Sequence, residues 1–464
     1  MPPPLATLIF LAFIYWLFAL ERKRRTGISS ALWIPTFWVL IIASRPVSLW
    51  LHPGIEEATV GTELEGSPLD RIFYFGIIIA GFIVLSKRHL EWKRVIAQNR
   101  WLFLFYGFFL LSCLWSAHPF VSLKRLFKDF GNVVMILVIL TEMNPIGAVK
   151  SLLARCTYVL LPLSVLFIQY YPQLGRGYVP FTWEPYYCGV TTGKNTLGEV
   201  LIIFGVFLVW EGSERWTRNR RGITRSEAIA WIVVLMMEFW LLWKAHSSTA
   251  LACFIFGSAI IFAMRLRFFQ SKVRHLGLYG AGLVGVLVVL NSVFNLGQFL
   301  TESLGRDATL TGRTEIWDRV LHAAHTNPMI GEGFWIFWDA DKSANLFPEF
   351  FFRLLQSHNG YIEMYVDGGY IGILLLIGLA ASFLAKAKQD MVRGTTIGIL
   401  YLLYALAALI YNYTEAAFAR LTLIWFAQLL AGIRIPARPA ARSSPRTVKR
   451  PIQRVERRIE IPGG

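Results

Sequence analysis

The chain is built from repeated apolar stretches, each of about the length that crosses a lipid bilayer, separated by short polar segments. Lipid offers no hydrogen-bond partners to a backbone, so an apolar stretch of this length is stable in a bilayer only as a helix. The composition agrees, since 55% of the 464 residues are hydrophobic and only 16% are charged. The fold class is therefore all-α: a polytopic membrane helical bundle.

The apolar runs between charged residues predict about 12–13 transmembrane helices. The candidate spans lie near residues 5–20, 30–51, 70–86, 101–116, 121–141, 151–171, 195–211, 228–246, 249–264, 276–294, 361–385, 395–412 and 420–433. The first run is followed, rather than preceded, by basic residues (21–25), which is the wrong order for a cleaved secretory signal. We therefore interpret it as a span.

The basic loops set the predicted orientation. Lys and Arg concentrate on one side of the predicted bundle, in loops 21–25, 87–94, 214–225, 265–274 and 386–393. The positive-inside rule makes that side cytoplasmic. The formal net charge of +17 is thus explained by loops and tail that meet anionic headgroups, and no nucleic-acid partner is expected.

The opposite, exterior side receives two long excursions, residues 172–194 and 295–360. Within the large periplasmic loop 295–360, residues 313–326 have the period of an amphipathic helix that ends before Asn327-Pro328. The predicted apolar face comprises Ile316, Trp317, Val320, Leu321 and Ala324. Such a face needs a surface to cover, and we expect it to lie across the mouth of the bundle and close a cavity.

The chain divides into one membrane domain, residues 1–433, which includes the large loop, and a C-terminal tail, residues 434–464. The tail has nine basic and two acidic residues, a net charge of +7, and five prolines. This composition cannot bury a core, so the tail is predicted to be disordered, cytoplasmic and close to the anionic inner leaflet.

Polar residues on the exterior side fall into four clusters. The clusters are Gly175–Gly177 with Gly193–Gly198, Thr311–Trp317, Ser357–Gly360 with Glu363 and Asp367, and Asn412–Glu415. Because all four face one side, they can converge on one cavity. Soluble-enzyme signatures such as a Walker A loop, an HExxH zinc motif or a GxSxG elbow are absent from the sequence.

Two residues stand out as candidates for catalysis. Arg313 opens the loop helix, where a forked guanidinium suits a phosphate or diphosphate, and His358 can accept a proton near neutral pH. Arg313 would otherwise be a membrane anchor, and His358 a residue bonded to the backbone at a helix start. His322 and His325 are weaker candidates, as are Lys124, Arg125 and Lys128 in the fifth span.

A further set of polar residues is predicted to bind substrate: Arg176, Lys194, Asn195, Asn359 and Glu415. The carboxylates Glu363, Asp367 and Glu415 lie at or near span ends, where an ionised group needs a partner. Pairing with Arg176 or Arg313 and a direct role in catalysis are both open for them.

Several of these motifs occur in an order that resembles the O-antigen ligase and polymerase superfamily, over about residues 30–433. They are Gly189–Gly198, Gly312–Trp317, Asn327–Phe334, His358–Tyr361 and Gly368–Gly372. The resemblance implies a glycosyltransferase of the bacterial inner membrane, with its active site facing the periplasm. It also implies an undecaprenyl diphosphate-linked glycan donor, a glycan or lipid A core acceptor, and no cofactor or metal.

Carried over to this chain, the resemblance makes Arg313 the diphosphate ligand and His358 the group that activates the acceptor hydroxyl. One departure bears on the subtype: ligases commonly carry an arginine in the turn after the eighth span, where this chain has His246-Ser247-Ser248-Thr249. With Asn412–Glu415, this turn is closer to the exopolysaccharide polymerase branch. The alternative function is a transporter or flippase of lipid-linked glycan, which performs no covalent chemistry.

Overall fold

The computed structural model describes residues 1–23, 27–52, 67–178, 183–218, 223–275, 313–338, 345–347 and 354–436. Nearly all regular structure in these ranges is helical, and their one sheet is a two-stranded antiparallel hairpin. In chain order the longer elements are α1 (Pro3–Arg22), α2 (Trp33–Ile42), α3 (Val47–Leu51), α5 (Pro68–Ser86), α6 (Trp92–Gln98), α7 (Arg100–Ser112), α8 (Pro119–Leu140), α9 (Pro145–Tyr170), α10 (Pro172–Gly175), β1 (Arg176–Tyr178), β2 (Pro185–Tyr187), α11 (Lys194–Arg218), α12 (Arg225–Ala245), α13 (Ser248–Ala263), α14 (Arg267–Ser271), α17 (Arg313–Ala323), α19 (Gly360–Val392), α20 (Ile397–Tyr411) and α21 (Leu423–Gly432). The all-α membrane fold is confirmed.

Within these ranges six helices are long and apolar enough to cross a membrane, or seven if the bent pair α6–α7 forms one span. The six are α1, α5, α9, α11, α12 and α19. Every predicted span falls on one or two helices, except 276–294, which lies outside the described residues. Some are shorter than predicted. The run 30–51, for example, is divided by Pro46, which has no N–H and precedes the short helix α3 as its N-cap.

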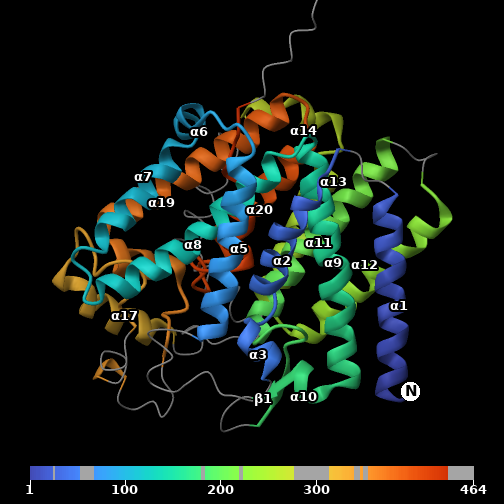
Figure 1. The fold of residues 1–464 in the computed structure, drawn as a ribbon, viewed down its shortest axis with the longest axis horizontal. Helices are drawn as coiled ribbons and strands as arrows, with labels where there is room; N and C mark the ends of the chain where they lie inside the picture. Colours follow the sequence, from blue (N-terminus) through green and yellow to red (C-terminus); the bar gives the residue numbers. More distant parts are fainter. Residues whose placement is uncertain are drawn as a thin grey trace, which may run out of the picture.

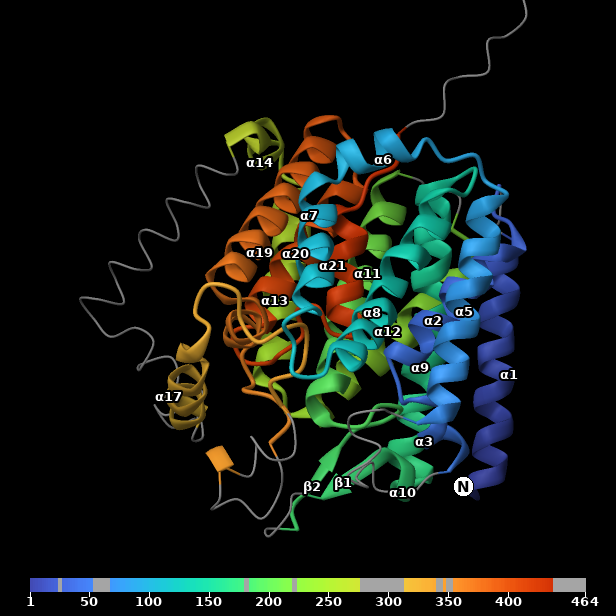
Figure 2. The same cartoon turned by 60° about the vertical axis from the view of Figure 1, so that its left-hand side comes forward.

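The two predicted exterior excursions share one end of the bundle. Figures 1 and 2 show the hairpin β1–β2, α10 and α17 at this end, and α6 and α14 at the opposite end. The described parts of loops 172–194 and 295–360 are therefore on the side opposite two of the basic loops, 87–94 and 265–274. This arrangement agrees with the sidedness predicted from loop charge.

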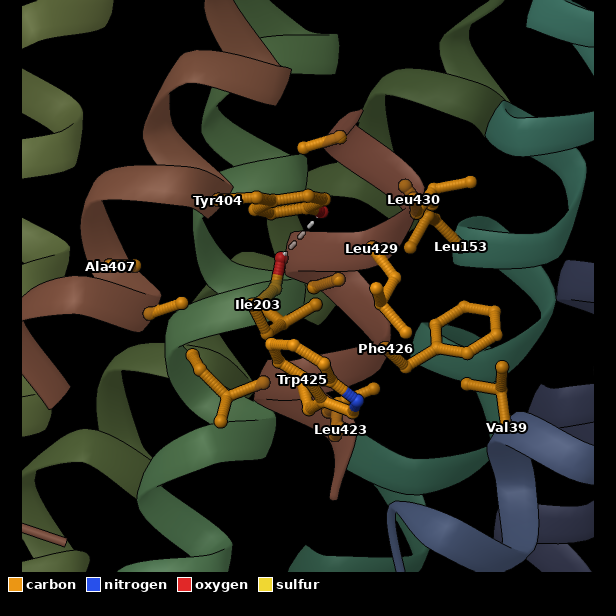
Figure 3. Close-up of a cluster of buried hydrophobic side chains, with 14 of the residues drawn as sticks. Val39, Leu153, Ile203, Tyr404, Ala407, Leu423, Trp425, Phe426, Leu429 and Leu430 are labelled. Carbon is orange, nitrogen blue, oxygen red and sulfur yellow. Dashed lines mark hydrogen bonds between the residues drawn. The ribbon is translucent and has the colours of Figure 1, made fainter. Parts of the chain in front are cut away.

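The core is centred on α21, a ten-residue helix in which every residue is buried. It contacts α20, α19, α11 and α8, so apolar residues cover its whole circumference. Figure 3 shows Trp425, Phe426 and Leu429 of this helix among side chains of the neighbouring helices. In the same cluster the buried Tyr404 hydroxyl donates to the Ile203 carbonyl at 3.0 Å, which satisfies its polar end.

Helix α19 is interrupted at Gly369, whose φ of +61° belongs to the left-handed region that favours glycine. The loop after α17 pairs with this break: Tyr370 N–H donates to Pro328 O at 2.8 Å and Gly333 N–H to Asp367 O at 3.0 Å. A Cβ on Gly369 would lie 2.4 Å from the Met329 carbonyl carbon. Two motifs quoted from the sequence, 327–334 and 368–372, thus fit against each other.

The amphipathic helix predicted at 313–326 is present as α17 followed by a 3₁₀ turn, Ala324–Thr326. Ile316, Val320 and Ala324 are buried, and they pack with residues of the following loop and of the start of α19. The prediction was wrong for Leu321, which is 37% exposed, because it lies at the edge of the buried face. The helix covers the beginning of α19, at the end of the bundle that carries the predicted site.

Candidate active site

Three predicted site residues converge on the carboxylate of a fourth, Glu415, which lies in the loop between α20 and α21. Asn195 Nδ2 donates to Glu415 Oε1 at 2.6 Å, and Arg313 Nη2 donates to the same oxygen at 3.0 Å. His358 Nδ1 lies 3.2 Å from Oε2. We call Glu415, Asn195, Arg313 and His358 the Glu415 cluster. Its members come from the start of α11, the start of α17, the residues before α19 and the α20–α21 loop.

The loop that carries Glu415 is held in shape by Asn412. The Asn412 side chain accepts hydrogen bonds from the N–H groups of Ala417 and Phe418, both at 2.8 Å. Gly360 N–H donates to the backbone oxygens of Asn412 and Glu415, at 2.8 and 3.0 Å. A Cβ on Gly360 would lie 2.0 Å from Asn412 Oδ1, so only glycine permits this approach. The first residue of α19 is thus tied to the Glu415 loop.

His358 is held in an uncommon conformation just before α19. Its φ is +55°, and the next residue, Asn359, caps the helix by accepting hydrogen bonds from Tyr361 and Ile362 N–H. On its other side, Ser357 N–H donates to Glu363 Oε1 at 2.6 Å and Ser357 O accepts from Trp317 Nε1 at 2.9 Å. These contacts fix the backbone around His358 without using its ring.

The contact with Glu415 determines which ring nitrogen of His358 carries a proton. An ionised carboxylate only accepts hydrogen bonds, so the neutral imidazole must present N–H at Nδ1 and a lone pair at Nε2. The His358 side chain is 29% exposed, whereas that of Glu415 is 11% exposed. The ring is therefore oriented by a mostly buried group while part of its surface remains open to a ligand, which is the arrangement of a general base.

Arg313 is the first residue of α17, as predicted. Its guanidinium donates to Thr414 O through Nη1 and to Glu415 through Nη2. Two of its five N–H donors serve these bonds, and the remaining donors suit a further anion. Arg313 therefore both compensates the charge of Glu415 and retains the capacity to bind phosphate oxygens.

A cavity of about 520 Å³ adjoins the Glu415 cluster. Its described lining residues are Tyr186, Gly193, Lys194, Asn195, Thr196, Glu199, Gln356, Tyr411, Glu415, Ala416 and Thr422. Burial raises the pKa of Tyr186, which contributes from the hairpin, so its hydroxyl stays protonated. The polar groups on this wall are the kind that bind hydroxyl-rich ligands.

The structure thus brings together Arg313, His358, Asn195 and Glu415, with Lys194 on the cavity wall and Asn359 beside His358 as a helix cap. Arg176 is placed differently. Its Nε and Nη2 donate to Ile168 O at 3.2 and 3.0 Å, and its guanidinium lies over the Tyr187 ring. These contacts hold the hairpin against the end of α9. The substrate-binding roles proposed for these residues, Arg176 included, stay predictions.

The weaker candidates have structural contacts. Arg125 donates to Trp335 O, Lys124 lies over the Phe120 ring and Lys128 over the Tyr74 ring. His322 and His325 face each other on α17 and the turn that follows it. His246 follows the last residue of α12 with a φ of +46°, and Thr249, in the first turn of α13, hydrogen-bonds with Thr414 at 3.3 Å.

Of the two alternatives left open for the carboxylates, pairing with Arg176 or Arg313 occurs for Glu415, through Arg313, whereas Glu363 and Asp367 pair with another arginine. Arg420, which the sequence reasoning did not single out, donates to Asp367 at 2.8 Å and to Glu363 at 3.1 Å. Arg420 is only 5% exposed. We call these three residues the Arg420 cluster. The sequence did contain a signal, since an arginine next to an apolar span requires an anionic partner.

Comparison with known proteins gives two matches. Residues 224–377 match the family model described as O-antigen ligase. The chain is also 24% identical over 311 residues to the exopolysaccharide production protein ExoQ of Rhizobium meliloti (strain 1021), covering 65% of this chain and 68% of that protein. The family match includes Arg313 and His358, and ends within α19.

The ordered motifs, the multi-span helical fold and these two matches agree with one another. The family implies an enzyme that transfers glycan, working in a membrane. Residues 224–377 of this chain are therefore similar to the O-antigen ligase family, and the chain as a whole resembles the O-antigen ligase and polymerase superfamily.

Proposed function

We propose that this protein is a periplasm-facing glycosyltransferase of the bacterial inner membrane, which takes glycan from an undecaprenyl diphosphate carrier in O-antigen or exopolysaccharide biosynthesis. The observation that carries the proposal is the convergence of His358 and Arg313 on Glu415 beside a polar cavity. A general base and a phosphate ligand, held by one carboxylate, are what transfer from a lipid diphosphate requires.

In the proposed reaction, the acceptor hydroxyl oxygen attacks the anomeric carbon of the lipid-linked sugar. The bond between that carbon and the phosphate oxygen breaks, and undecaprenyl diphosphate leaves with the electron pair. Nε2 of His358 takes the hydroxyl proton, and Glu415 stabilises the imidazolium that forms at Nδ1. A direct displacement of this kind inverts the configuration at the anomeric carbon.

Arg313 would stabilise the negative charge that develops on the departing diphosphate. Such stabilisation is commonly the largest single catalytic contribution, since the donors are already oriented before the reaction. The contacts of Arg313 with Thr414 and Glu415 hold its guanidinium in place for this role. Lys194, on the cavity wall, is a second cation within the same site.

Two observations favour a polymerase of exopolysaccharide over a ligase to the lipid A core. The relative that the chain resembles is named for exopolysaccharide production. The resemblance implies an arginine in ligases after the eighth span, where this chain has Thr249, in the first turn of α13 and bonded to Thr414. The proposed acceptor is therefore the glycan of a second lipid-linked molecule.

The test is glycan transfer by purified protein in liposomes that contain undecaprenyl diphosphate-linked oligosaccharide, with products identified by mass spectrometry. Wild-type protein should form longer chains and release undecaprenyl diphosphate. Replacing His358 or Arg313 by Ala should lower turnover by about 100-fold or more, since general-base and oxyanion contributions are each of that order.

Arg319→Ala is the matched control for Arg313→Ala, because Arg319 lies on the same helix and pairs with the exposed Glu315. His322→Ala serves the same purpose for His358→Ala. Both controls should retain activity. Movement of lipid-linked glycan across the membrane without bond formation would instead identify a flippase, and full activity of His358→Ala would remove the proposed base.

A further inference from the structure

One cavity residue, Glu199, is not used by the proposed chemistry. It lies on α11, four residues after Asn195, so the two side chains share one face of the helix. Asn195 contacts the Glu415 cluster, and Glu199 lines the same cavity from further along the helix. Glu199 is 5% exposed. Burying a carboxylate away from water is energetically costly, so its presence here requires an explanation.

The contacts of Glu199 leave it as an acceptor facing the cavity. Tyr411 donates its hydroxyl to Glu199 Oε1 at 3.3 Å, and Ile424 N–H, at the start of α21, lies 3.3 Å from Oε2. No Lys, Arg or His of the described ranges forms an ion pair with Glu199. The Leu423 N–H also donates to this carboxylate. Each carboxylate oxygen can accept two hydrogen bonds, so the group retains capacity for a ligand.

The charges around the cavity differ between its parts. The charge of Glu415 is offset by Arg313 and by its bond to His358. Lys194 is the one cation among the described lining residues, whereas Glu199 has hydrogen-bond donors but no cation beside it. When the Glu199 carboxyl is ionised, a diphosphate or a sugar carboxylate beside it would place two anions together in a mostly buried site. Neutral hydroxyl groups would instead donate to it.

We propose that Glu199 is the specificity-determining residue of a subsite that binds a neutral, hydroxyl-rich sugar ring and excludes uronic acids. Tyr186, Gln356 and Asn195 supply further hydrogen-bonding groups on the same wall. This inference rests on the proposed function for the identity of the ligand as part of a glycan. The ring is either the acceptor sugar or the donor sugar, since both present the same hydroxyl chemistry.

The direct test measures sugar binding in the absence of any lipid carrier, so that it does not depend on turnover. Saturation-transfer NMR would be recorded on the purified full-length protein with cellobiose, lactose and maltose, and with cellobiouronic acid. Wild-type protein should bind the best neutral disaccharide about 10- to 100-fold more tightly than the acid, the range expected for hydrogen bonds to a charged group.

Glu199→Gln should reduce this preference to less than about threefold, because the amide carries no charge to repel the acid. Glu315→Gln, on the exposed face of α17, is the control and should retain the wild-type preference. Glu199→Asp keeps the charge and should retain the exclusion of the acid. It also provides a folded variant if the glutamine variant has a lowered melting temperature.

Kinetics in the liposome assay show whether the subsite binds the sugar of the acceptor or that of the donor. A KM that rises for the acceptor alone in Glu199→Gln assigns the subsite to the acceptor, and one that rises for the donor alone assigns it to the donor. Equal binding of neutral and acidic disaccharides by the wild type, or an unchanged preference in Glu199→Gln, overturns the subsite. Binding with the predicted preference in a protein that shows no transfer would reject the proposed function and retain the subsite.

Discussion

The Glu415 cluster and the Arg420 cluster combine the same chemical groups in different surroundings. Each joins arginine to carboxylate at the same end of the bundle, and both contact the first turns of α19 or the residues just before them. The Arg420 side chain is 7% exposed, and Glu363 and Asp367 are 2% and 1% exposed. The Arg313 and His358 side chains are 18% and 29% exposed, beside a cavity.

The difference supports the proposal that the Glu415 cluster serves the reaction, whereas the Arg420 cluster serves the fold. In the Arg420 cluster Glu363 also binds other groups of the protein, since it accepts Trp338 Nε1 at 2.9 Å and Ser357 N–H at 2.6 Å. In the Glu415 cluster, donors of Arg313 and a lone pair of His358 remain for a ligand. Paired charges that are closed to solvent stabilise or position, whereas partly open ones can bind substrate.

The largest expected effect is on the stability of the Arg420 cluster. Arg420→Ala leaves Glu363 and Asp367 as buried carboxylates without their cation, which should cost about 3–5 kcal/mol of the free energy of unfolding. Thermal unfolding of the purified protein in detergent measures this loss. Adding Glu363→Gln and Asp367→Asn to Arg420→Ala should recover part of it. An unchanged melting temperature in Arg420→Ala would show that the Arg420 cluster does not stabilise the fold more than the Glu415 cluster does.

The second prediction concerns the Glu415 cluster, where activity should suffer more than stability. Glu415→Gln retains an amide oxygen but loses the charge that fixes the tautomer of His358, so turnover should drop by about 100-fold or more. The stability loss should be about 1 kcal/mol, the scale of one weakened hydrogen bond. Parallel measurement of glycan transfer and melting temperature checks this. A stability loss as large as that of Arg420→Ala would erase the contrast between the clusters.

The sequence predicted the helices well because membrane spans follow from local composition. Apolar runs located the helices, and loop charge placed 172–194 and 295–360 at one end of the bundle. The amphipathic period of residues 313–326 predicted α17 and most of its buried face. Breaks were harder to predict, because the interruption of α19 at Gly369 depends on the distant loop 328–333 that pairs with it.

The site was predicted in part for a similar reason. His358, Arg313, Asn195 and Glu415 were named from polar clusters and from the superfamily motifs, and the structure brings them together. Glu199 and Arg420 were missed, because each lies at the edge of an apolar run and acquires its partners only by tertiary packing. Which arginine pairs with which carboxylate is a property of the folded bundle, so sequence spacing could not have distinguished Arg420 from Arg176.

The smallest expected effect tests a third arginine–carboxylate pair, in which Arg88, just after α5, contacts Glu142 in the loop between α8 and α9. Burial alone would raise the pKa of Glu142, but the N–H and hydroxyl of Ser29, at 2.8 and 2.7 Å, and the charge of Arg88 outweigh it and lower that pKa. A carboxylate whose pKa is lowered by folding stabilises the fold above its ordinary value of 4.5. This stabilisation is lost as the pH falls below that value through the lowered pKa.

The melting temperature of wild-type protein should therefore exceed that of Glu142→Gln at neutral pH, and the difference between the two should shrink at about pH 3. Glycan transfer at neutral pH should be unchanged in this variant, since Glu142 is remote from the cavity that contains Glu415. A difference in melting temperature that grows as the pH falls would contradict the assignment of Glu142 as a paired anion. A loss of glycan transfer in Glu142→Gln would show that an ion pair outside the cavity also affects the reaction.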